Sequence, residues 1–178
     1  LRQLHAELIH GLEVDGTIAG IGPDDLLIHH FSLGSRASRT AFAAPARMIL
    51  IYHNITPPEF FRGYDDELVR IAAHGRRELS TLAGSCDLAL GDSEFNRQEL
   101  EAFGFERSGV LPILLDFGPY REVEPSPVLS RMLGDRRPNF LFVGRVFPNK
   151  RFEDLARLAF FYKKYVSENF RFLLVGKA

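Results

Sequence analysis

The sequence is poor in the features that would tie it to an oxidising compartment, a membrane or a charged polymer. It has one cysteine in 178 residues, so no disulfide can form within the chain, and a reducing compartment is favoured. Its formal net charge is −1, with no acidic or basic tail, which argues against nucleic acid as a partner. No apolar run approaches the roughly 18 residues of a membrane-spanning helix. Leu1 opens directly onto a helical pattern and not onto a signal peptide.

Patterns typical of a metal site are also missing. The histidines and the single cysteine show no spacing of a zinc site. His29 and His30 are adjacent in a predicted strand, so their side chains point to opposite faces and cannot both bind one metal ion. His5 and His10 do not have the i, i+4 spacing of a helical ligand pair. We therefore expect no metal and no resident cofactor.

The sequence does contain the alternation of elements that is typical of an α/β protein. Hydrophobic residues make up 46% and charged residues 25%, which predicts a globular chain. Apolar runs predict strands at 25–31, 46–54, 86–92, 109–116, 139–143 and 170–176. Apolar residues at helical spacing predict helices at 1–12, 65–84, 93–104, 127–134 and 151–169. Because apolar strands alternate with helices, we expect a Rossmann-like parallel sheet with flanking helices.

A change in composition divides the chain into two domains. The segment FGPYREVEPSPVLSRMLGDRRP, residues 117–138, holds four prolines and many charges. It predicts a linker at 119–138 between a first domain, 1–118, and the start of a second, 139–178. The second block is a single β-α-β unit, which cannot cover both faces of its own sheet. We therefore expect a further C-terminal region, or a second chain, to complete it.

Two cations stand where a predicted strand gives way to a helix. In FLFVGRVFPNKRFEDLARLAF the apolar run ends at Gly144, and Arg145 and Lys150 precede the helical pattern. Ligands of open parallel sheets bind beyond the carboxyl ends of the strands, and helix N-termini favour anions. Arg145 can donate two hydrogen bonds to a phosphate and Lys150 adds a compact charge, so the pair could bind a diphosphate and stabilise it as a leaving group. The alternative is a surface ion pair with Glu153 or Asp154.

The same segment resembles a known family. VGRVFPNKRFEDLARLAF is similar to the opening of the donor domain in retaining family-4 glycosyltransferases of the GT-B fold, which has a pattern like VGR…K-G…L…A. DDLLIHH, ILIYHNITPPEFF, DLALGDSEFNRQEL and VLPILLD resemble, in order, segments of that family's first domain. The resemblance covers about residues 25–178. It departs from the family at Arg151, where a glycine is usual, and in VLPILLD, which lacks the asparagine-glycine of the family's motif.

The resemblance implies transfer of a sugar from a nucleoside diphosphate sugar to a hydroxyl acceptor, with retention and without a metal. The acceptor would be a carbohydrate or a lipid-linked alcohol. Gly144, Arg145 and Lys150 match the positions that bind the donor diphosphate, and Arg145 and Lys150 would act in catalysis on the departing group. His53 matches a histidine that lines the cleft between the domains and helps to place the sugar. The family's first strand and its acidic E-x7-E motif fall outside residues 1–178, so we expect this chain alone to be weakly active or inactive.

Four further residues are candidates for the acceptor side of that cleft. Asn54 and Thr56 follow His53 and could bind sugar hydroxyls, or merely form a turn. Ser93 and Glu94 follow a predicted strand. The simpler interpretation makes Ser93 an N-cap, and explains Glu94 by the helix dipole.

Other functions stay open on the sequence alone. One alternative is a nucleotide-sugar epimerase of the GT-B fold, and another is a non-catalytic binding module that keeps the fold. Basic residues on the 65–84 helix, namely Arg70, His74, Arg76 and Arg77, would suit weak peripheral association with a membrane, although a solvated helix face explains them more simply. We expect a cytoplasmic location, with the inner membrane face as the alternative.

Overall fold

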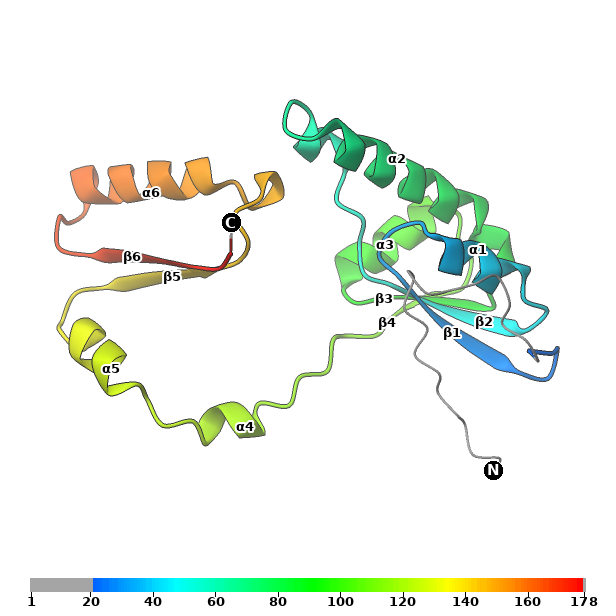
Figure 1. Ribbon diagram of the computed structural model, residues 1–178, viewed down its shortest axis with the longest axis horizontal. Helices are drawn as coiled ribbons and strands as arrows, with labels where there is room; N and C mark the ends of the chain where they lie inside the picture. The colour runs from blue at the N-terminus through cyan, green and yellow to red at the C-terminus, as the bar shows by residue number, and fades with distance from the viewer. Residues whose placement is uncertain (1–20, 178) are drawn as a thin grey trace. The chain divides into compact units, whose positions relative to one another are not determined.

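A computed structural model describes residues 21–177 (Figure 1). The predicted helix at 1–12 lies outside the described residues. The chain divides into two compact units, with the boundary between Leu114 and Leu115. Each unit is described by itself.

The first unit is built on a four-stranded parallel sheet. Its strands are β1 (Leu26–Phe31), β2 (Arg47–Tyr52), β3 (Leu88–Gly91) and β4 (Ser108–Val110), and they lie in the order β1-β2-β3-β4. The strands are joined by helices α1 (Arg36–Ala43), α2 (Asp66–Thr81) and α3 (Glu94–Ala102), with short 3-10 turns at Pro58–Phe61 and Ala83–Ser85 (Figure 1). The predicted α/β class with a Rossmann-like parallel sheet and flanking helices is confirmed.

One face of this sheet carries the core. Phe31, Leu50 and Tyr52 are fully buried on it, on adjacent strands. His29 shares the face, because its register partner is Leu50, and its ring lies edge-on to Phe31 at 5.9 Å between centroids. Burial, and secondarily the neighbouring His30, lower the pKa of His29 to about 4, so this side chain is neutral at pH 7.

The other face is more open at its β1 edge. Leu26 and Ile28 are 48% and 55% exposed there, and His30 follows them at the same alternation. His29 and His30 therefore point to opposite faces, as the sequence predicts.

Several elements differ from the prediction. The predicted 109–116 strand ends at Val110. The backbone N–H of Leu111 still donates to the carbonyl of Gly91 at 2.9 Å, but residues 112–115 are exposed and outside the strand, and Pro112 has no N–H to donate to a ladder. The 65–84 helix ends at Thr81 and gives way to a 3-10 turn. Helix α1 was not expected, because its eight residues are too few for a clear helical period.

The second unit contains one β-α-β motif. Strands β5 (Asn139–Val143) and β6 (Arg171–Val175) pair in parallel and are connected through helix α6 (Phe152–Tyr165). Short helices α4 (Gly118–Arg121) and α5 (Pro127–Leu133) occupy the segment expected to be a linker, and a 3-10 turn spans Pro148–Lys150.

The second unit is held by aromatic contacts without a fully buried core. The Phe140 ring lies against Tyr162 at 4.9 Å and against Phe172 at 5.1 Å between centroids. All residues described from 115 to 177 keep some exposure to solvent. Large apolar side chains such as Leu141, Phe160 and Tyr165 are more than half exposed. Such a surface is typical of a unit that packs against something further.

Candidate functional site

The carboxyl edge of the first sheet gathers side chains from three strands. His30 lies near the end of β1, His53 follows β2 and Asp92 follows β3. The hydrogen-bond ladder continues past the strands, because the backbone N–H of His53 donates to the carbonyl of Phe31 at 2.9 Å. With side chains alternating along each strand, His30, His53 and Asp92 project on the same, more open face of the sheet.

These three side chains form a chain of polar contacts, which we call the histidine chain. Nδ1 of His30 lies 2.8 Å from Nε2 of His53, and the two ring planes differ by 12°. Nδ1 of His53 lies 3.6 Å from Oδ2 of Asp92. The other carboxylate oxygen of Asp92 accepts a hydrogen bond from the side-chain amide of Asn96, which is buried on α3. The acid end of the chain is therefore fixed by a helix, and His30 is the exposed end.

A buried network fixes the loop that carries His53. The hydroxyl of Tyr52 donates to Glu99 at 2.5 Å and accepts from the backbone N–H of Ile55 at 3.0 Å. The guanidinium of Arg76 donates to Glu99 at 2.5 Å and to the carbonyl of Ile55 at 2.8 Å. Burial and the hydrogen bond to Glu99 raise the pKa of Tyr52, so its phenol remains protonated. Arg76 thus serves this network and is not part of a free basic face on α2.

Asn54 has an unusual backbone conformation next to His53. Its φ is 71°, in the left-handed region that asparagine tolerates better than most residues, and its side chain is exposed. Thr56 follows and is half-buried. The chain therefore turns sharply directly after His53, which holds Asn54 at the sheet edge.

Ser93 and Glu94 have local structural roles at the start of α3. Oγ of Ser93 accepts a hydrogen bond from the backbone N–H of Asn96 at 3.2 Å, which confirms the predicted N-cap. Glu94 pairs with Arg97 at 2.6 Å, and that pairing lowers the pKa of Glu94. Their assignment to an acceptor site remains a prediction.

The carboxyl edge of the second sheet is formed by two glycine-cation steps. The backbone N–H of Gly144 donates to the carbonyl of Val175, and that of Val146 donates to the carbonyl of Lys177, both at 2.9 Å. This continues the register that pairs Val143 with Val175, so Arg145 lies opposite Lys177. The backbones are so close at the preceding pair that a Cβ on Gly176 would lie 1.9 Å from the carbonyl oxygen of Gly144.

Lys177 is the cation that the sequence reasoning missed. A signal for it was present, because β5 ends in Phe-Val-Gly-Arg and β6 in Leu-Val-Gly-Lys. In parallel neighbouring strands, such a repeated ending places the two cations side by side. We call Arg145, Lys150 and Lys177 the cationic edge.

The ion pairs of this loop involve a different arginine from the one suspected. Arg151 lies 2.5 Å from Asp154 and 3.9 Å from Glu153, whereas Arg145 and Lys150 form no ion pair with any residue the structure describes. The guanidinium of Arg145 lies over the Phe147 ring, 5.4 Å from its centroid. The suspected surface pairing of Arg145 or Lys150 with those acids is therefore absent from the described chain.

Arg151 occupies a backbone conformation that suits glycine. Its φ is 50° and its ψ 54°, in the left-handed region, and it precedes the first residue of α6. An arginine costs roughly 1 kcal/mol there relative to glycine. The position at which the resemblance leads one to expect glycine is thus one whose geometry favours glycine.

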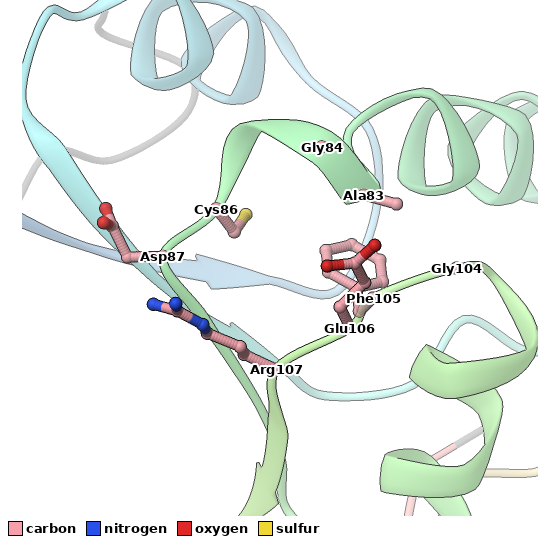
Figure 2. Close-up of a pocket in the computed structure, with 8 residues that line it drawn as sticks. All are labelled: Ala83, Gly84, Cys86, Asp87, Gly104, Phe105, Glu106 and Arg107. Carbon is pink, nitrogen blue, oxygen red and sulfur yellow. The ribbon is translucent and has the colours of Figure 1, made fainter.

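A hollow of about 350 Å³ lies at the opposite edge of the first sheet, where β3 and β4 begin (Figure 2). None of the predicted site residues line it. Cys86 lies in its wall, and burial raises the pKa of that thiol to about 11, so it is unreactive at neutral pH. Asp87 accepts from the backbone N–H of Met48 at 2.8 Å, which gives it a structural role.

Two absences in the described part of the chain bear on the class of site. Between residues 21 and 177, no group of three or more histidine, cysteine, aspartate and glutamate side chains is arranged to hold a metal ion. In the same part of the chain, no helix combines the length and the apolar character needed to cross a bilayer.

The comparisons with known proteins identify no family for this chain. No protein-family model matches the chain. No curated protein matches it either.

Proposed function

We propose that this chain belongs to a glycosyltransferase that moves a sugar from a nucleoside diphosphate sugar to a hydroxyl acceptor, with retention. The observation that carries the proposal is the cationic edge. Arg145 and Lys177 lie opposite each other at the carboxyl ends of β5 and β6, and Lys150 ends the 3-10 turn that follows β5. In the described chain no carboxylate pairs with any of the three. A diphosphate is an anion, so it can supply the negative charge that pairs with these cations.

The ends of the two strands bring these side chains close together. A Cβ on Gly176 would lie 1.9 Å from the carbonyl oxygen of Gly144, so glycine at this position allows the close approach that places Arg145 opposite Lys177. Arg145 can donate two parallel hydrogen bonds, and its stacking on Phe147 limits the guanidinium to few orientations. The developing charge on a departing diphosphate would be stabilised by these donors, which is the largest catalytic effect such an edge can supply.

The ordered set of segments DDLLIHH, YHNITPPEFF, GDSEFNRQEL and VGRVFPNK supports the transferase class over other diphosphate binders. In the fold, DDLLIHH forms most of β1, and each of the other three segments runs out of a parallel strand at its carboxyl end. We assign His53 and Asn54 to sugar or acceptor hydroxyls, and Thr56, Ser93 and Glu94 to the surroundings of that group. The acceptor would be a carbohydrate or a lipid-linked alcohol, met in the cytoplasm or at the inner membrane face.

The test is release of nucleoside diphosphate from a panel of UDP-, GDP- and ADP-sugars, with and without hydroxyl acceptors. A denaturing gel of the source cells, probed with an antibody to residues 21–114, identifies the length of protein to assay. We expect acceptor-dependent release, and a loss of about 2–4 kcal/mol in transition-state stabilisation in Arg145→Ala. Lys163→Ala, an exposed cation in the last turn of α6, is the matched control and should leave kcat/KM unchanged.

Other outcomes would contradict the transferase. An altered sugar nucleotide formed without any acceptor would indicate a GT-B epimerase instead. No turnover from any donor, together with full biological activity of the Arg145→Ala/Lys150→Ala double variant, would indicate a binding module.

A further inference from the structure

We propose that His30 is a general base that takes the proton of a hydroxyl substrate. His53 orients His30 and accepts a proton from it, and Asp92 orients His53. The inference rests on the proposed function in one respect, namely that the reaction consumes a hydroxyl acceptor. The inference comes from the geometry of the histidine chain. The sequence shows His30 only as one of two adjacent histidines and does not show its contact with His53.

The proton positions follow from the order of the contacts. The carboxylate of Asp92 faces Nδ1 of His53 at 3.6 Å and favours a proton on that nitrogen. In a neutral His53, Nε2 then carries the lone pair and accepts the hydrogen bond of 2.8 Å from Nδ1–H of His30. This leaves Nε2 of His30 with a free lone pair. His30 is exposed, so that lone pair is open to a substrate.

The three side chains of the histidine chain become more exposed from Asp92 to His30. The side chains of Asp92 and His53 are 17% and 31% exposed, and His30 is the most exposed of the three. The carboxylate is held by Asn96 and lies beside the N-terminus of α3, where a negative charge is favoured. A positive charge that forms on the imidazoles is therefore stabilised from the protein side, while the reacting nitrogen faces outward.

The proposed step balances as follows. The hydroxyl proton moves to Nε2 of His30, and the proton on Nδ1 of His30 moves to Nε2 of His53. The imidazolium of His53 keeps its Nδ1 proton facing Asp92. The hydroxyl oxygen keeps the electron pair of its broken O–H bond and bonds with it to the sugar carbon on the face from which the diphosphate departs, so configuration is retained. The electrons of the bond from that carbon to the diphosphate leave with the diphosphate.

Two nearly parallel imidazoles at a sheet edge could instead do no more than tie β1 to the loop after β2. That role needs the hydrogen bond but not the specific tautomers, and it does not need Asp92. The test must therefore read the ring protons and the reactivity of His30, and not only stability or activity.

The first experiment uses this chain, labelled with ¹⁵N on its histidine rings, and reads the ring nitrogens by long-range ¹⁵N–¹H NMR above pH 8. The expected result is protonation of Nδ1 on both His30 and His53. Asp92→Asn should shift the His53 proton to Nε2 and reverse His30 with it. Asp66→Asn, in an exposed acid at the start of α2, is the control and should change neither ring.

The second experiment measures acylation by diethyl pyrocarbonate, mapped by mass spectrometry. His74 is exposed on α2 and serves as the internal reference. We expect His30 to react about fivefold faster than His74, because an imidazole whose Nδ1–H donates a hydrogen bond to His53 is the stronger nucleophile at Nε2. We expect Asp92→Asn to remove this difference. His30→Gln confirms the site of modification.

The results separate this inference from the transferase itself, because neither experiment uses a sugar nucleotide. The inference is overturned if His53 carries its proton on Nε2 in the unaltered chain, or if Asp92→Asn leaves the reactivity of His30 unchanged. Should transferase activity be found, His30→Gln should lower kcat by roughly a hundredfold with little effect on KM for the donor. An unchanged kcat would overturn the base while the transferase stood.

Discussion

The two units have similar backbone geometry at the carboxyl edges of their sheets but carry side chains of different chemistry there. In both, parallel strands finish at one edge and the ladder runs on for a residue or two into a loop. At the first edge the side chains are two imidazoles backed by a carboxylate, which can move a proton. At the second they are cations, which can hold an anion. The same parallel β-α-β geometry thus carries imidazoles in one unit, where we propose a proton acceptor, and cations in the other, where we propose a diphosphate site.

The edges also differ in how firmly they are held. The loop with His53 is tied to α2 and α3 through the buried side chain of Tyr52 and the partly buried side chains of Arg76 and Glu99. The loop with Arg145 has a surface ion pair at Arg151 and an aromatic contact at Phe147. Proton transfer between side chains requires fixed distances, whereas flexible side chains can bind a phosphate by closing around it. We therefore expect changes at the first edge to alter stability, and changes at the second to alter binding.

Glu99→Ala should show the largest effect. It leaves Arg76 partly buried without its carboxylate and removes the acceptor of Tyr52, so we expect a loss of about 3–5 kcal/mol in the free energy of unfolding. Glu101→Ala on the same helix breaks an exposed pair with Arg97 and should cost less than about 1 kcal/mol. Urea denaturation of both variants checks this. Equal losses would mean that the network does not hold the first edge.

His29 should make the stability of the first unit depend on pH. Its folded pKa is about 4 against an ordinary value of 6.5, so the unfolded chain binds the extra proton between those values. The contribution of His29 to the free energy of unfolding is fully present above about pH 6.5. It is lost as the pH falls towards 4, and the loss is at most about 3 kcal/mol. His29→Phe should flatten that slope, and His74→Gln should not. A slope that survives in His29→Phe would assign the acid sensitivity to another group.

Much of this comparison could be predicted from the sequence, and some could not. The parallel α/β class and the position of Arg145 and Lys150 after a strand follow from apolar runs, helical spacing and a glycine ending, which are local patterns. The contact of His30 with His53 depends on the register of two strands separated by α1, a helix too short to leave a clear pattern. Lys177 likewise acquires its neighbour only through the pairing of β5 with β6.

Lys177→Ala tests the second edge without touching the first. The loss of one of three cations should weaken binding of inorganic diphosphate by about tenfold and leave unfolding by urea unchanged. Lys163→Ala, on the same unit, should bind as the unaltered chain does. Isothermal titration at low and high salt checks both. Identical affinities for the two variants would remove Lys177 from the site.

Arg151 offers the smallest effect and a sharp sign. Glycine relieves the left-handed backbone at this position, whereas alanine keeps it, and both lose the surface pair with Asp154. Arg151→Gly should therefore unfold with about 1 kcal/mol more free energy than Arg151→Ala. Thermal unfolding of the pair reads the difference directly. An alanine variant as stable as the glycine variant would contradict the backbone argument.

The central claim is that anion binding belongs to the cationic edge and not to the histidine chain. The direct measurement is an NMR titration of the assigned chain with inorganic diphosphate, followed at every backbone amide. The account predicts saturable shifts at residues 144–151 and at Gly176 and Lys177, with His53 and Asp92 unmoved. Shifts centred on His53 and Asp92, or none at 144–151, would contradict it.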